Sequence, residues 1–108
     1  MPIFIKTEKF KDKTLELSNK ERNKFLFMHK QWVKEMTKLG HYIQSGYLIN
    51  EKKIPGGGGL LILEAKDYLT AEKIIANDPM IKNDLVKWDL QEWISIDQRQ
   101  PKFSNYLG

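Results

Sequence analysis

The sequence predicts one α+β domain whose elements follow in the order strand, helix, strand, strand, helix, strand. Residues 19–39 carry apolar side chains at three- and four-residue spacing, which is the period of an amphipathic helix. Short runs rich in β-branched and aromatic residues are separated by glycine, proline or asparagine, as expected of strands joined by turns. The chain has 108 residues, the size of a single domain.

Composition excludes several classes of protein. Apolar residues make up 41% of the chain, enough for a core and too many for a disordered segment. There is no cysteine, which excludes a disulfide framework and a zinc–thiolate site. No apolar run is long enough for a signal peptide or a membrane span, so we expect a cytoplasmic protein with no membrane partner.

The net charge of +4 raises the question of nucleic-acid binding. The positive charge comes almost entirely from lysine, and the only arginines are Arg22 and Arg99. Readers of phosphates and bases rely on the bidentate contacts of arginine. Because the lysines are also interleaved with acids along the whole chain, we do not expect a nucleic-acid partner.

The helix over residues 19–39 has clear start and stop signals. Ser18 and Glu21 form a capping-box pattern at its start, and Gly40 stands where a glycine ends a helix. One apolar stripe follows the helix, made of Phe25, Met28, His29, Trp32, Val33, Met36 and Leu39.

The remaining elements are shorter. Asp67 is placed to cap a second helix that runs to about Ala76. Residues 50–59, with Pro55 and four consecutive glycines, are typical of a hairpin loop. We expect strands at 3–5, 41–49, 60–63 and 86–96.

Two strand–helix–strand crossovers in tandem predict a ferredoxin-like βαββαβ domain, residues 1–96, with a C-terminal tail at 97–108. Both helices lie on one face of a four-stranded antiparallel sheet in this arrangement. Residues 60–63 are nevertheless apolar on both faces, and Phe4, Tyr47 and Trp93 lie opposite their strand neighbours. A monomer would expose a large apolar face, so we expect a homodimer that forms through the sheet faces.

His29 and Asp78 are the candidates for acid–base chemistry. His29 lies inside the apolar stripe, where a core histidine bonded to a carbonyl is one interpretation. Asp78 precedes Pro79, and an aspartate cap with proline at the first position of a short helix is the simplest reading. Alternatively, Asp78 orients His29 as the partner of a general base. Spacing alone leaves these readings open.

Other candidate sites have weaker support. The glycine run lacks the Gly-Lys-Ser/Thr ending of a phosphate-binding loop, and a strand follows it. Glu92 lies on an otherwise apolar strand face, and either a bulge relieves it or it reaches the dimer interface. His41 is expected to be a solvated residue at a strand start. No histidine or acid cluster indicates a metal site, and no cofactor is expected.

In their order and spacing, several motifs resemble the YciI-like (YCII-related) family of dimeric α+β barrel proteins. The resemblance covers about residues 1–96. Tyr47 stands where the family usually has proline, and Met80 where it usually has phenylalanine, so a relative's substrate is not carried over. The residues that carry the resemblance are His29, Gly40, Ser45-Gly46, the proline–glycine loop, 61–65, Asn77-Asp78-Pro79 and Glu92-Trp93.

The resemblance implies a His29–Asp78 catalytic dyad in a small-molecule enzyme with lyase, hydrolase or dehalogenase-like chemistry. Ser45, Gly46 and Glu92 are then the expected substrate-binding residues. A non-catalytic binding or interaction module on the same fold is the alternative. A third reading is a dimeric barrel that binds haem or oxidises quinol-like substrates.

Overall fold

The computed structural model describes residues 1–97, and among these it has one sheet of four antiparallel strands in the order β2-β3-β1-β4. The predicted tail, 97–108, lies outside the described residues except for Asp97. The elements are β1 (Ile3–Phe10), α1 (Asp12–Leu15), α2 (Asn19–Lys38), β2 (Ile43–Ile49), β3 (Pro55–Glu64), α3 (Tyr68–Ile75), α4 (Pro79–Lys82) and β4 (Val86–Trp93).

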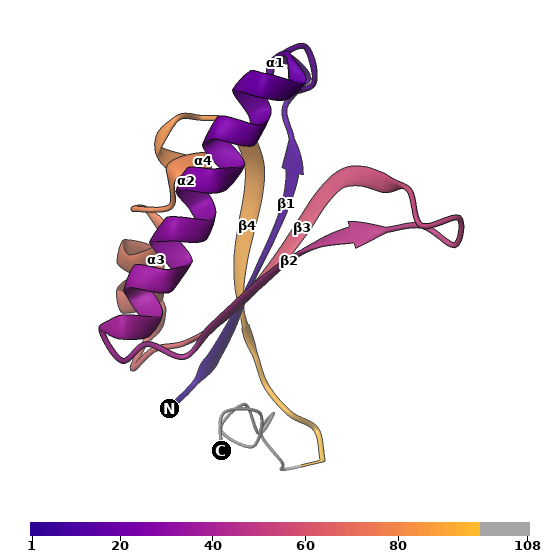
Figure 1. The fold of residues 1–108 in the computed structure, drawn as a ribbon. Coiled ribbons are helices and arrows are strands. Elements are labelled where there is room, and N and C mark those ends of the chain that lie inside the picture. The colour runs from indigo at the N-terminus through magenta and orange to yellow at the C-terminus, as the bar shows by residue number, and fades with distance from the viewer. Residues whose placement is uncertain (98–108) are drawn as a thin grey trace.

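Helices α2 and α3 cover the same face of the sheet, and the β2–β3 hairpin extends away from both helices (Figure 1). Each long helix connects two strands that run in the same direction with a third strand between them, as the crossover rule requires. The ferredoxin-like prediction is therefore confirmed. The short helix α1 was not expected, whereas α4 is the short helix that the aspartate-cap interpretation placed after Asp78.

Strand β1 is longer than the predicted 3–5 because it continues through charged residues to Phe10. Phe4, Lys6 and Glu8 alternate onto the helix-covered face. Phe4 and Lys6 are both fully buried there. A lysine on a buried strand face breaks the apolar pattern, which is why the sequence suggested too short a strand.

Helix α2 begins and ends as predicted. The Ser18 side chain accepts from the Glu21 N–H, and the Glu21 side chain accepts from the Ser18 N–H, which completes the capping box. Gly40 follows with φ of +94°, a left-handed conformation that favours glycine. The apolar stripe is narrower than expected, because Met28 and Leu39 are exposed.

The glycine run is not a loop, and this prediction was wrong. β3 begins at Pro55, and Gly58 and Gly59 pair with residues of β1. The turn occupies only 50–54, where the Asn50 side chain accepts from two backbone N–H groups. Glycines have no side chains to form an alternating pattern, but their backbone groups still form a strand ladder.

The other strands differ from prediction only at their ends. β2 starts two residues later than expected, and β4 ends at Trp93, so Ile94 and Ile96 lie beyond it and are exposed. The core under the helices combines sheet and helix residues, namely Phe4, Trp32, Leu61, Leu63, Ala65, Ala71, Ile75 and Leu90. Because Leu61 and Leu63 face this core, Leu60 and Ile62 point to the opposite face.

Candidate active site

Helix α2 positions His29 between the helix and the sheet. Phe25, one turn earlier, is half-buried beside the cluster of Met80, and Trp32, one turn later, is buried in the core. The rings of His29 and Trp32 lie 5.8 Å apart between centroids. The His29 side chain is 14% exposed, so solvent and small solutes can still reach it.

Asp78 begins helix α4. Its Oδ1 accepts from the Met80 N–H at 3.0 Å, and Pro79 occupies the first helical position. The aspartate-cap interpretation is therefore confirmed. The side chain is completely buried, and a buried carboxylate needs partners for its charge as well as for its lone pairs.

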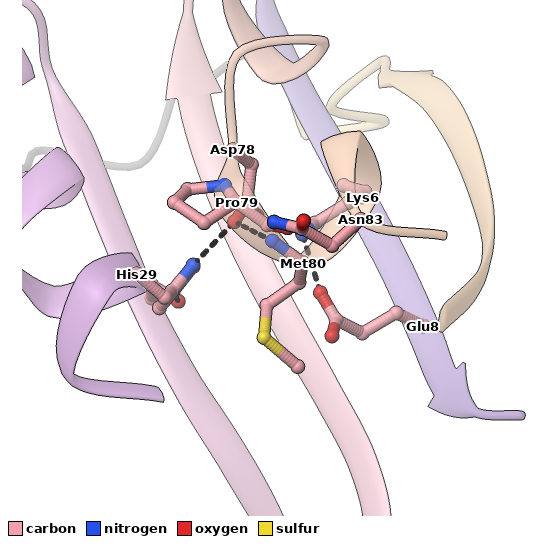
Figure 2. A network of polar contacts seen from close by, with 8 residues as sticks. Lys6, Glu8, His29, Asp78, Pro79, Met80 and Asn83 are labelled. Carbon is pink, nitrogen blue, oxygen red and sulfur yellow. Dashed lines mark hydrogen bonds and ion pairs between the residues drawn. The ribbon is translucent and has the colours of Figure 1, made fainter. Parts of the chain in front are cut away.

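The structure brings His29 and Asp78 into contact across 49 residues of sequence. His29 Nδ1 lies 2.8 Å from Asp78 Oδ1, an interaction visible in Figure 2. The other ring nitrogen, Nε2, lies 2.8 Å from the Oγ of Ser45 on β2. The three side chains therefore form one hydrogen-bonded row, with the imidazole between a carboxylate and a hydroxyl.

Lys6 is the part of the site that the sequence did not reveal. Its Nζ lies 3.0 Å from Asp78 Oδ2 and also contacts the Glu8 carboxylate. Figure 2 shows Lys6 and Glu8 on the side of Asp78 away from His29. The available signal was the spacing of Phe4, Lys6 and Glu8, which is the two-residue period of one strand face.

The surroundings of Asp78 keep it ionised. Burial by itself would raise the pKa of Asp78, but the hydrogen bond from His29, the positive charge of Lys6 and the Met80 N–H together hold that pKa below its usual value. An ionised carboxylate only accepts hydrogen bonds.

The proton positions on neutral His29 follow from this charge state. Nδ1 must carry the proton that Asp78 accepts, which leaves the Nε2 lone pair directed at Ser45. Nε2 is thus the basic atom, and it faces the hydroxyl of Ser45.

The two other predicted binding residues lie outside this row. Gly46 follows Ser45 but points to the opposite sheet face, where it pairs with Leu60. Glu92 is exposed on β4 opposite Phe4 and makes no hydrogen bond to His29, Asp78 or Ser45.

A hollow of about 270 Å³ opens on the β2–β3 hairpin beside Ser45. Most of its wall belongs to the face that α2 and α3 do not cover, so it adjoins the site only through β2. The hollow is lined by Gln44, Ser45, Gly46, Tyr47, Leu48, Leu60 and Ile62.

Within residues 1–97, no group of three or more histidine or acidic side chains is arranged to hold a metal ion. In the same part of the chain, no helix combines the length and apolar character needed to cross a membrane.

Solved structures of three other proteins share this fold. A 5-chloro-2-hydroxyhydroquinone dehydrochlorinase from Burkholderia phenoliruptrix AC1100, in complex with 2,5-dihydroxybenzoquinone, is 19% identical with a TM-score of 0.66, over 91% of this chain and 99% of its own. An antibiotic biosynthesis monooxygenase is 12% identical with a TM-score of 0.55, over 89% of this chain and 99% of its own. The protein YJCS is 14% identical with a TM-score of 0.51, over 88% of this chain and 99% of its own.

No protein-family model matches the chain, and neither does any curated protein sequence. At these identities the likeness concerns the fold alone, and it agrees with the predicted ferredoxin-like class.

Proposed function

We propose that this protein is a small-molecule enzyme in which His29 is the general acid–base and Asp78 orients it. The observation that carries the proposal is the position of the His29 ring, whose Nδ1 is fixed by buried Asp78 while Nε2 faces a hydroxyl at the open edge of the site. A base held by an orienting carboxylate is the arrangement used for proton transfer in enzymes.

In this proposal each polar side chain has one task. His29 Nε2 takes a proton from the substrate or returns one to it, and Asp78 stabilises the imidazolium that forms. Lys6 is a positioning residue, because its ammonium holds the second oxygen of Asp78. Ser45 binds a polar group of the substrate at the position where Nε2 acts.

The substrate class we propose is a compact hydroxylated aromatic or quinone-like molecule. The support is the fold shared with a dehydrochlorinase that was solved with 2,5-dihydroxybenzoquinone. Nε2 takes a proton from a ring hydroxyl while the halogen-bearing ring carbon gains a proton, which gives the keto tautomer. Loss of a second hydroxyl proton together with halide then gives the quinone.

We further propose that the chain is a YciI-like protein and acts as a homodimer. The motifs around His29, Ser45 and Asp78 support the first statement. Leu60, Ile62 and the half-exposed Trp93 support the second, because they give the uncovered sheet face an apolar surface.

The first experiment is ¹⁵N NMR of the histidine rings, since the chain has only two histidines. In the wild type we expect neutral His29 to carry its proton on Nδ1. In Asp78→Asn that preference is lost, because the amide can donate to the ring as well as accept from it. His41 is the internal reference and keeps its tautomer in both proteins.

The second measurement is turnover of a chlorinated hydroxyhydroquinone, followed by chloride release. We expect His29→Ala and Asp78→Asn to lose about 10²-fold or more of the activity, consistent with proton-transfer catalysis. His41→Ala and Asp84→Asn are matched controls that retain it. Saturable binding of such compounds without any product would instead favour a non-catalytic binding module, and full activity of both variants would refute the dyad.

A further inference from the structure

We infer that Ser45 is a nucleophile and that the site transfers acyl groups from neutral esters by way of an acyl-serine. The inference rests on the proposed His29–Asp78 pair and assigns it a second kind of chemistry. The observation is geometric. Ser45 Oγ, His29 and Asp78 are joined by two contacts of 2.8 Å, which is the nucleophile–base–orienter pattern of serine hydrolases.

The direction of the hydrogen bonds suits this role. Because ionised Asp78 accepts from Nδ1, the Ser45 hydroxyl must donate to the lone pair of Nε2. That is the proton which a serine loses when it attacks a carbonyl. Ser45 is exposed, so an acyl donor can reach its Oγ without displacing the core.

The strand that carries Ser45 also supplies a donor for the developing oxyanion. The Glu64 N–H bonds to the Tyr42 carbonyl, so even-numbered residues of β2 direct their backbone groups towards β3. The N–H of Ser45 therefore points to the free edge, since β2 is an edge strand of the sheet in residues 1–97. The backbone N–H of the nucleophile itself is one of the usual oxyanion donors.

The charges at the site determine which acyl donors can bind. With His29 neutral, Asp78 and Glu8 contribute two negative charges, and Lys6 contributes one positive charge. A net negative site disfavours an anionic acyl group. A neutral ester with a good leaving group is therefore the expected substrate class.

The reaction balances with water as the only co-reactant. Ser45 Oγ bonds to the acyl carbon and passes its proton to His29 Nε2. The bond to the leaving alcohol then breaks, and that alcohol takes the proton from His29. Water attacks the acyl-serine, gives a proton to Nε2 and releases the acid, and Ser45 regains its hydrogen.

The test is acylation by p-nitrophenyl acetate, measured as a burst of p-nitrophenolate and as an acetyl adduct located by mass spectrometry. We expect the wild type to carry the adduct on Ser45, and Ser45→Ala to lose it. His29→Ala should slow acylation of Ser45 by about 10²–10⁴-fold. Ser95→Ala is the matched control, because Ser95 bonds to Asp97 and to no histidine. An anionic succinyl ester should react more slowly than the acetate.

Adducts on lysines alone, or equal labelling of Ser45 in the wild type and His29→Ala, would overturn the inference. Because labelling is read on the wild type as well, the result does not depend on a variant that fails to fold. The histidine tautomers distinguish the two proposals. If Asp78→Asn changes the His29 tautomer but Ser45 is never acylated, the dyad stands and Ser45 is only a hydrogen-bonding partner.

Discussion

Asp78 has two roles, as the cap of α4 and as the partner of His29 and Lys6. The cap and the contact with His29 were separate interpretations of the sequence, and the structure accommodates both because Oδ1 has more than one lone pair, while Oδ2 remains for Lys6. What the sequence could not indicate was the partner of Lys6, since Asp78 lies 72 residues away. A buried lysine is recognised only when the opposite charge is placed beside it.

The depressed pKa of Asp78 makes stability depend on pH. When the pKa of a carboxyl group is lower in the folded than in the unfolded chain, the group stabilises the fold at pH values above its unfolded pKa. That contribution is lost as the pH falls through the folded pKa. We therefore expect the free energy of unfolding to be constant above about pH 5 as far as Asp78 is concerned, and to fall below it. In Asp78→Asn, the free energy of unfolding should depend less on pH below about pH 5 than in the wild type, as measured by denaturation at a series of acidic pH values.

Asp84→Asn is the control for this measurement. Asp84 is exposed, and its pKa is lowered by Lys11 and Lys13, so salt should remove its contribution and leave that of Asp78. The carboxyl carbon of Asp78 can also be titrated directly by ¹³C NMR in the wild type. A midpoint at or above the usual aspartate value would contradict the network.

At the scale of elements, α2 was predictable, whereas β3 was predicted only over residues 60–63 and its glycine half was not. The capping pair Ser18–Glu21 and the period of the apolar stripe are local signals, and both are realised. The glycines of β3 carry no local signal for a strand. Gly58 and Gly59 are held by pairing with β1, a contact between segments far apart in the chain, so tertiary structure overrides their preference for loops.

The glycines of β3 are not equivalent, and this can be tested. Gly57 has φ of +76°, where an alanine Cβ costs about 1 kcal/mol or more, whereas Gly56 has ordinary φ and open space around it. We expect Gly57→Ala to lower the free energy of unfolding by about 1–2 kcal/mol and Gly56→Ala to leave it unchanged or slightly raised. Urea denaturation of both variants gives the comparison. Equal effects would show that the backbone at Gly57 relaxes freely.

At the scale of the whole molecule, the helices leave one sheet face uncovered. Leu60 and Ile62 lie on this face and are only partly buried by the described residues. The proposed homodimer explains how such a face avoids water.

A charge placed on the uncovered face should therefore break the dimer. We expect sedimentation equilibrium to give a dimer for the wild type and a monomer for Ile62→Lys. Leu39→Lys is the control, because Leu39 is a large exposed apolar residue at the end of α2, away from this face. A wild-type monomer at all concentrations, or an Ile62→Lys dimer of unchanged affinity, would reject sheet-to-sheet association.

Lys6 also restricts how this protein can change during evolution. Its ammonium is shared by Asp78 and Glu8, and removal of one member of a buried ion pair costs about 3–5 kcal/mol, a large part of the stability of a small domain. A neutral residue at position 6 would leave the buried carboxylate of Asp78 without its cation, whatever residue stands at position 8. Loss of Lys6 is therefore tolerated only together with loss of the charge at position 78, which also removes the partner of His29. Among homologues, a lysine at position 6 should accordingly accompany the His29–Asp78 pair.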